Sequence, residues 1–111
     1  MSDFIIKNGV LEKYTGNETK VVIPDSVTVI GGGAFWGCES LKEITIPDSV
    51  TEIGGHAFYY CLSLKEITIP DSVIDIGECA FKGCEDLVIK APENSYAQKY
   101  AEENEIKFEA V

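Results

Sequence analysis

A repeat of 23 residues is the feature of this sequence that most constrains its fold. The segment Ile-Pro-Asp-Ser-Val begins at Ile23, at Ile46 and at Ile69, and residues 40–50 are identical to residues 63–73. A unit of this length cannot bury its own apolar face, so it becomes stable only when neighbouring units stack on it. The repeat therefore predicts a short right-handed solenoid made of similar coils.

Each unit contains one short strand followed by a turn. Residues 41–46 read Leu-Lys-Glu-Ile-Thr-Ile, with three apolar residues facing the interior and the residues between them facing solvent. Pro47 ends the strand because proline has no backbone N–H to donate. The Ala-Phe-x-x-Cys segment at residues 57–61 predicts a helical turn whose Phe fills the gap between coils. Stacking such units predicts a parallel sheet along one side of the solenoid.

Both ends of the chain depart from the repeat in ways that suit caps. Residues 4–14 place two apolar runs around Asn8-Gly9, which predicts a β-hairpin. Residues 87–91 alternate as a last strand, Ser95 to Gln98 forms a capping box that opens a helix ending near Asn104, and residues 106–108 predict a closing strand. We therefore expect a single domain over residues 1–111, with an N-terminal cap (1–17), repeats (18–86), and a last strand with the C-terminal cap (87–111).

The repeat motif resembles a known family. The pattern C-x-x-L-x-x-I-x-I-P-x-x-V-x-x-I-G-x-x-A-F, present at residues 38–58 and 61–81, is similar to the BspA-like (Treponema pallidum-type) bacterial leucine-rich repeat. The segments at residues 8–16 and 95–101 are similar to the family's end segments. The resemblance implies an α/β leucine-rich-repeat solenoid. It also implies a bacterial cell-surface protein that binds host matrix proteins, host cells or other microbes, although the family has no shared ligand motif.

The function that this resemblance implies is non-enzymatic protein binding of the adhesion type. The identical blocks at residues 40–50 and 63–73 leave open an alternative, a minimal or engineered repeat scaffold without an evolved ligand. A metal-binding domain is a third hypothesis. No catalytic residue, bound metal or cofactor is expected from the motifs.

Charge excludes several classes of partner. The chain has 19 acidic residues against 9 lysines and no arginine, giving a net charge of −10, which disfavours nucleic acid and anionic membranes. Its apolar runs are far shorter than the ~20 residues that span a bilayer, so no membrane insertion is expected. The start of the chain has no basic leader followed by a long apolar run, so no signal peptide is predicted. The compartment stays open, because the family implies the cell surface while unpaired thiols suit a reducing setting.

Two surfaces are candidates for contact with a protein, and the first is aromatic. Trp36, Tyr59 and Tyr60 lie between the Phe and Cys positions of their units, where exposure is expected, and Trp and Tyr often anchor interfaces. We hypothesise that this patch contacts a partner protein, a glycan or a second copy of the chain. The second surface is the outward side of the strands, where opposite charges are expected to lie side by side and nearly cancel. Its residues are Lys42, Glu43, Thr45, Lys65, Glu66 and Thr68.

The cysteines recur at one position of the repeat. Cys38, Cys61 and Cys84 should stack one strand spacing apart, and we expect free, buried thiols because parallel side chains on adjacent coils are poorly placed for a disulfide. His56 and Cys79 share another repeat position and, with Cys61 and Cys84, supply enough ligands for zinc. We expect His56 and Cys79 to face outward, which argues against zinc. A Cys61–His56 nucleophile lacks an orienting acid or oxyanion donor.

A ladder of aspartates accompanies the turn prolines. Asp25, Asp48 and Asp71 occur once per unit, and the expected role is a turn residue that bonds its own backbone. Calcium bound between successive carboxylates is the functional alternative.

Overall fold

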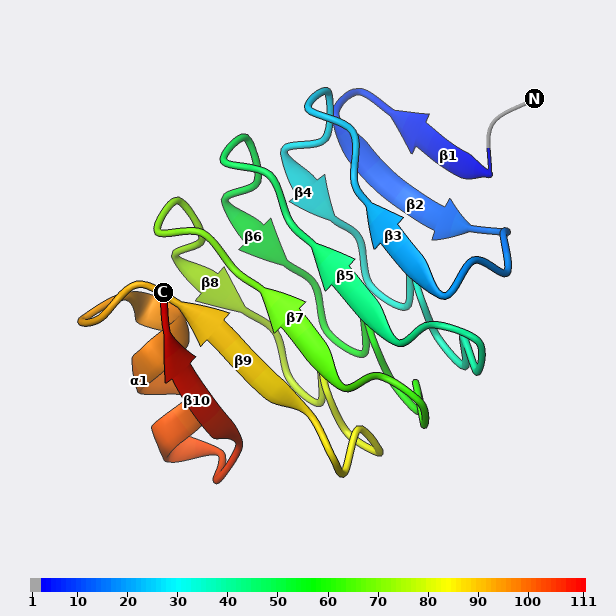
Figure 1. Cartoon of the computed structure of the whole chain (residues 1–111). Coiled ribbons are helices and arrows are strands. Elements are labelled where there is room, and N and C mark those ends of the chain that lie inside the picture. The colour runs from blue at the N-terminus through cyan, green and yellow to red at the C-terminus, as the bar shows by residue number, and fades with distance from the viewer. Residues whose placement is uncertain (1–2) are drawn as a thin grey trace.

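The chain winds into stacked coils around one apolar core. The computed structural model describes residues 3–111 and has principal extents of 37 × 25 × 23 Å. The first sheet is parallel throughout, in the order β10-β9-β7-β5-β3, and follows one side of the stack (Figure 1). Its strands are β3 (Lys20–Val22), β5 (Glu43–Thr45), β7 (Glu66–Thr68), β9 (Val88–Ala91) and β10 (Lys107–Ala110). The register aligns Val21, Ile44, Ile67 and Ile89, so the apolar positions form one buried row.

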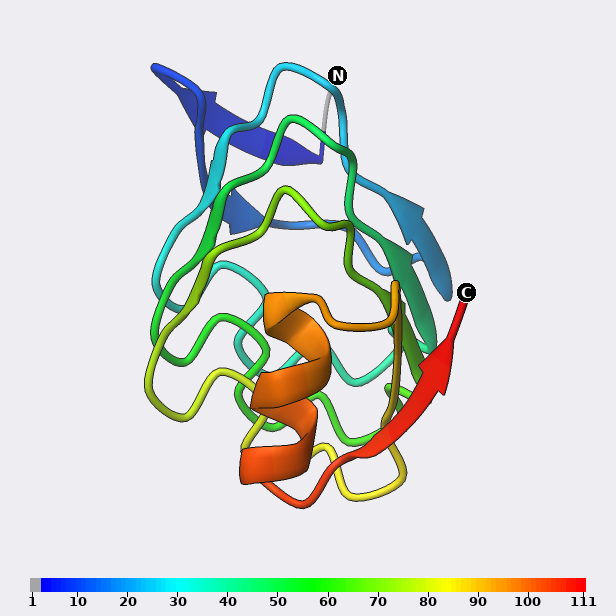
Figure 2. The ribbon, with the colours of Figure 1, turned by 90° about the vertical axis from the view of Figure 1, so that its left-hand side faces the viewer.

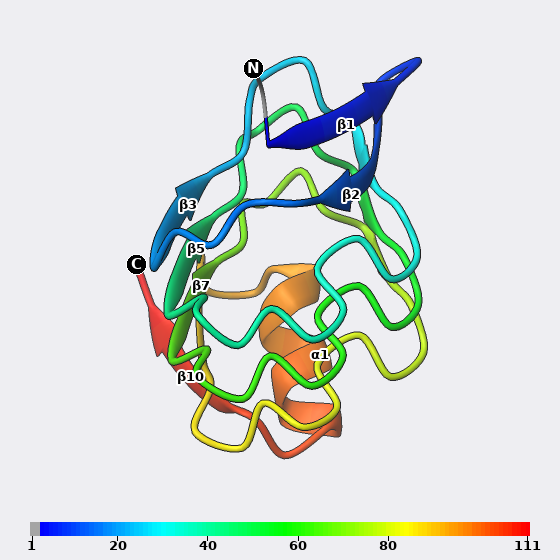
Figure 3. The same ribbon diagram turned by 90° about the vertical axis from the view of Figure 1, so that its right-hand side faces the viewer.

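A second five-stranded sheet, which the sequence analysis did not predict, covers the next side of the coils. Its order is β1-β2-β4-β6-β8. The hairpin of β1 (Phe4–Lys7) and β2 (Val10–Tyr14) is antiparallel, turns at Asn8-Gly9 as expected, and closes the N-terminal end of the stack (Figure 3). The other strands have two residues each: β4 (Val29–Ile30), β6 (Glu52–Ile53) and β8 (Asp75–Ile76). Two residues are too few to show an alternating pattern, so these strands have no recognisable signal in the sequence.

The third side of the stack is an irregular surface that we call the turn edge, made of residues 31–40, 54–63 and 77–86. The helical turn expected there is absent. Each coil instead forms successive tight turns, such as Ala57 N–H to Gly54 O at 3.3 Å and Cys61 N–H to Phe58 O at 3.2 Å. Residues with positive φ interrupt the helical conformation, for example Tyr60 at 56° and Gly83 at 91°. Because a right-handed helix requires negative φ, the segment cannot propagate as a helix.

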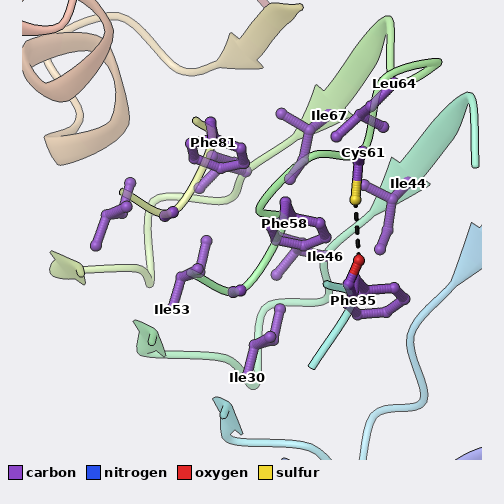
Figure 4. Packing of buried hydrophobic residues seen from close by; sticks show 14 of the residues in the cluster. Ile30, Phe35, Ile44, Ile46, Ile53, Phe58, Cys61, Leu64, Ile67 and Phe81 are labelled. Atoms are coloured by element: carbon purple, nitrogen blue, oxygen red, sulfur yellow. Dashed lines mark hydrogen bonds between the residues drawn. The ribbon is translucent and has the colours of Figure 1, made fainter. Parts of the chain in front are cut away.

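Stacked aromatic rings fill the gaps between coils, as the sequence predicts for Phe. Phe58 lies between Phe35 and Phe81, with ring centroids 5.0 and 5.3 Å away (Figure 4). Tyr14 of the N-terminal cap continues the row at 5.1 Å from Phe35, and Tyr100 of the C-terminal cap lies 6.0 Å from Phe81 in an edge contact. The caps therefore end the aromatic row with rings of their own.

The C-terminal cap follows the predicted helix and strand. Helix α1 (Tyr96–Glu103) begins after Ser95, whose hydroxyl accepts a hydrogen bond from Gln98 N at 3.2 Å, and it ends at the C-cap Asn104. Ala97 and Ala101 are fully buried, and α1 lies across the end of the coils (Figure 2). Strand β10 then pairs with β9.

Serine side chains link the turns that follow the first sheet. Ser49 Oγ donates to Val27 O and Ser72 Oγ donates to Val50 O, both at 2.7 Å. These bonds join each turn to the preceding coil.

The prediction that the neighbouring aspartates bond their own backbone was wrong. The turn is closed by the backbone, as in Val50 N–H to Pro47 O at 3.1 Å, and within residues 3–111 no Asp25, Asp48 or Asp71 side chain bonds its own backbone. Their carboxylates are exposed because the backbone and serine already satisfy the turn.

Candidate protein-contact site

The three aromatic residues singled out in the sequence lie together on the turn edge, and a fourth ring joins them. Trp36 lies 4.5 Å from Tyr59 and 5.6 Å from His56 between ring centroids, and His56 lies 5.1 Å from Tyr59. Tyr60 lies 4.3 Å from Tyr59. Trp36, His56, Tyr59 and Tyr60 are the residues that we call the aromatic cluster. Trp36 and Tyr60 remain 52% and 47% exposed, so much of this aromatic surface contacts solvent.

Two residues of the aromatic cluster have a backbone conformation that favours glycine. His56 has φ of 59° and Tyr60 has φ of 56°. At the repeat position of His56 the first coil has Gly33, and at the position of Tyr60 the first and third coils have Gly37 and Gly83. A side chain with a Cβ is strained in this region. His56 and Tyr60 therefore occupy positions at which any side chain other than that of glycine strains the backbone.

A glycine of the next coil provides the space for Tyr60. A Cβ added at Gly83 would collide with Tyr60 Cδ1 and would lie 3.0 Å from Tyr60 Cα. The ring of Tyr60 therefore lies over the backbone of the third coil. Leu62, two residues further along the chain, is also an exposed apolar residue, with 61% of its surface accessible. Two features thus position Tyr60: its own positive φ and the missing side chain at residue 83.

Sequence reasoning did not place His56 in this site. It treated His56 only as a metal ligand or a base, whereas the imidazole is half-buried against Trp36, with the two ring planes 18° apart. A signal was available in the repeat itself. Aligning the coils shows His56 where the first coil has Gly33, and such a replacement of glycine by a ring marks a departure from the repeat design.

On the strand face, the carboxylates of Glu43 and Glu66 pair with lysines of neighbouring strands. In the first sheet Glu43 is directly opposite Glu66, and Thr45 is opposite Thr68, so like residues stack along the axis. Lys20 Nζ of β3 lies 3.7 Å from Glu43, and Lys90 Nζ of β9 lies 3.3 Å from Glu66. Lys42 and Lys65 are exposed beside them. These ion pairs are solvent-accessible, so each contributes little to stability.

The cysteines at residues 38, 61 and 84 form a ladder of free thiols along the core side of the turn edge. Cys61 and Cys84 are buried and donate to the carbonyls of Phe35 and Phe58 at 3.0 and 3.2 Å, whereas Cys38 is half-buried. Although the hydrogen bond with Cys38 acts to lower the pKa of Cys61, the hydrogen bond with Cys84 and burial raise it to about 12. A hydrogen bond to Cys61 and burial also raise the pKa of Cys38, and a hydrogen bond with Cys61 lowers the pKa of Cys84.

Neither the metal site nor the nucleophile gains support from this geometry. Among residues 3–111, no three His, Cys, Asp or Glu side chains gather closely enough to hold a metal ion. Cys61 is buried with a raised pKa, and a nucleophilic cysteine needs the opposite environment. In the same described residues, no helix combines the length and apolarity required to cross a membrane.

The stacked coils, each contributing one short parallel strand and one interior Phe, define a leucine-rich-repeat solenoid, which is a protein-interaction fold. The model of the BspA type leucine rich repeat region matches residues 5–107 in six copies, and the chain therefore belongs to this family.

Solved bacterial structures have the same fold. The chain is 39% identical to a leucine rich cell surface protein from Faecalibacterium prausnitzii, with a TM-score of 0.70, over 78% of this chain and 27% of that one. It is 38% identical to a leucine-rich repeat protein from Bacteroides ovatus, with a TM-score of 0.67, over 79% of this chain and 23% of that one. The chain thus spans about a quarter of each relative's length. Comparison with curated proteins gives no significant match.

Proposed function

We propose that this chain is a non-enzymatic module of the adhesion type that binds a partner protein through the aromatic cluster. The observation that carries the proposal is the backbone of His56 and Tyr60, which have positive φ at positions where the first coil has glycine. Strained residues persist where the surrounding fold holds them and are frequent at binding sites. Exposed Trp and Tyr are also the side chains that most often dominate binding energy. The cell-surface location of the Faecalibacterium relative agrees with adhesion.

Binding to purified matrix proteins tests this proposal. We would immobilise a panel of such proteins and compare the intact chain with the triple variant Trp36→Ser, Tyr59→Ser, Tyr60→Ser. The expected result is binding by the intact chain and its loss, by about tenfold or more, in the variant, because an aromatic anchor contributes roughly 2 kcal/mol or more. The matched control is the triple variant Ile5→Ser, Val22→Ser, Ile74→Ser, which removes exposed apolar side chains elsewhere and should bind normally.

Equal affinity of the two triple variants for a bound matrix protein would contradict the proposed contact surface. Light scattering on the same proteins shows whether the aromatic cluster instead joins two copies of the chain. A dimer that becomes a monomer on the aromatic substitutions alone would replace the partner protein with a second copy.

The alternative function is a minimal or engineered scaffold without a ligand. It is favoured by the identity of residues 40–50 and 63–73, because surfaces selected for a ligand usually diverge between repeats. This alternative would be favoured if the chain binds none of the matrix proteins and is a monomer both with and without the aromatic substitutions.

A further inference from the structure

Six backbone hydrogen bonds join successive coils within the turn edge, and all six run in the same direction. At every second residue, a backbone N–H donates to a carbonyl of the following coil over 2.7–3.1 Å. The bonds are Gly33 to Gly55, Phe35 to Ala57 and Gly37 to Tyr59 between the first two coils, then His56 to Glu78, Phe58 to Ala80 and Tyr60 to Lys82. The intervening N–H groups close the tight turns within each coil. This row of backbone hydrogen bonds, which we call the turn-edge ladder, therefore has carbonyl groups at the N-terminal end of the stack and N–H groups at its C-terminal end.

The N–H end is unoccupied on the last coil. By the repeat, the N–H groups of Cys79, Phe81 and Gly83 point toward a following coil, and within residues 3–111 none of the three has an acceptor. The cap covers the two sheets instead: β10 pairs with β9, and α1 packs against β8 and β9. An unpaired backbone N–H in a nearly buried residue is unusual, and Phe81 is only 5% exposed.

A cleft opens in front of these three N–H groups, between the last coil and the cap. It has a volume of about 660 Å³, within the range of ligand sites. Phe81, Tyr100 and Ile106 give it apolar walls, and Cys79 and Gly83 line it as well. The cleft therefore offers hydrogen-bond donors in a row together with apolar surface for a side chain.

The charges around the cleft argue against an anion. Three carboxylates line it, from Glu78, Glu85 and Glu105, against two ammonium groups, from Lys82 and Lys107. A phosphate or a free carboxylate would meet this excess of negative charge. A neutral acceptor such as a main-chain carbonyl avoids that repulsion.

We propose that this cleft binds a peptide segment of a partner protein, whose main-chain carbonyls accept hydrogen bonds from the N–H groups of Cys79, Phe81 and Gly83. The same row of donors already binds backbone at the two junctions between coils, where an interior Phe of the incoming segment packs on the Phe below it. Backbone pairing supplies affinity and the apolar walls supply selectivity, as in other modes that extend an open backbone ladder. This site adjoins the aromatic cluster at Gly83, over which the Tyr60 ring lies, but the proposal does not depend on the function proposed for the cluster.

The test uses a peptide with the sequence of residues 54–63, with Cys61→Ser and blocked ends, as the probe. In the intact protein this segment accepts the three bonds donated by the first coil. We would add it to the full-length ¹⁵N-labelled chain and follow the amide resonances. The amide resonances of Cys79, Phe81 and Gly83 should move downfield in a saturable way. Their exchange with solvent should slow by at least about tenfold, as expected for newly protected N–H groups.

Two matched variants control for binding elsewhere. Lys107→Trp places a bulky ring at the cleft and should abolish the shifts, whereas Lys7→Trp makes the same change on an exposed residue of β1, in the opposite cap, and should leave them intact. The proposal is overturned if the three amides do not respond to the peptide, which would indicate water as the occupant. It is also overturned if inorganic phosphate alone moves them, or if they already exchange slowly in the free protein. Shifts that persist in Lys107→Trp would also overturn the proposed cleft. Loss of the shifts with unchanged matrix binding in Lys107→Trp would leave the function of the aromatic cluster unaffected.

Discussion

At the scale of single residues, several non-glycine residues of the turn edge have positive φ, a backbone conformation that glycine adopts readily and other residues do not. Cys79 shares its repeat position with Gly33 and His56 and has φ of 57°. Its side chain is half-buried and has no ring to stack, whereas His56, also half-buried, stacks against Trp36. Ring stacking therefore offsets backbone strain at His56 but not at Cys79.

We predict that Cys79→Gly stabilises the protein by about 0.5–1 kcal/mol, because glycine adopts positive φ without strain. The matched control is Cys38→Gly, which also removes a half-buried thiol but at a residue without positive φ, and should destabilise it. Urea unfolding under reducing conditions measures both changes. A lower free energy of unfolding for Cys79→Gly would contradict the strain argument.

The buried thiol of Cys61 predicts a pH dependence of stability. Its pKa is about 12 in the folded chain against the ordinary 9.0, so folding favours the protonated thiol. The stabilisation is fully present below pH 9 and is lost as the pH rises toward 12. We expect the free energy of unfolding to fall above pH 9 less steeply in Cys61→Ser than in the wild type. Parallel slopes in urea unfolding at several alkaline pH values would refute this.

At the scale of elements, α1 depends on its capping residue. Ser95 is 4% exposed and accepts the hydrogen bond of Gln98 N, which has no partner within the first turn of the helix. Ser95→Ala should lower the free energy of unfolding by about 1 kcal/mol. Ser40→Ala, on an exposed loop, is the control and should change it by less than about 0.5 kcal/mol. Equal effects of the two changes in thermal unfolding would show that the cap is dispensable.

The two sheets illustrate which elements a sequence reveals. Strands β5 and β7 have the alternating apolar pattern and flanking proline, and they were predicted. Strands β4, β6 and β8 contain one buried residue each and form because stacking brings Ile30, Ile53 and Ile76 into register. Glycine follows each of these isoleucines, and a Cβ at Gly54 would lie 2.6 Å from Gly32 N. The close approach of coils, rather than local preference, therefore makes this sheet.

At the scale of the whole molecule, one row of rings connects the two caps. Phe58 is at its centre and fully buried, with a stacked ring on each side. We predict that Phe58→Ala lowers the free energy of unfolding by about 3–5 kcal/mol, because the cavity interrupts the core between coils. Ile74→Ala, at a 70% exposed residue, should change it by less than about 0.5 kcal/mol. Calorimetry of both variants checks the difference, and a small loss for Phe58→Ala would argue that the coils are stabilised independently.

The sequence by itself determined the period of the coils and the interior Phe and Ile positions, because burial of a periodic apolar pattern leaves few other arrangements, and its departures from the repeat at both ends indicated the two caps. It also indicated Trp36, Tyr59 and Tyr60 as a patch. Only the tertiary structure decided that His56 joins them and that Glu43, directly opposite Glu66, pairs with Lys20 of the neighbouring strand. It also decided that the turn-edge ladder ends in the N–H groups of Cys79, Phe81 and Gly83, three residues that line a cleft. These features depend on backbone dihedrals and on which atoms of one coil meet the next, and side-chain periodicity does not encode either of them.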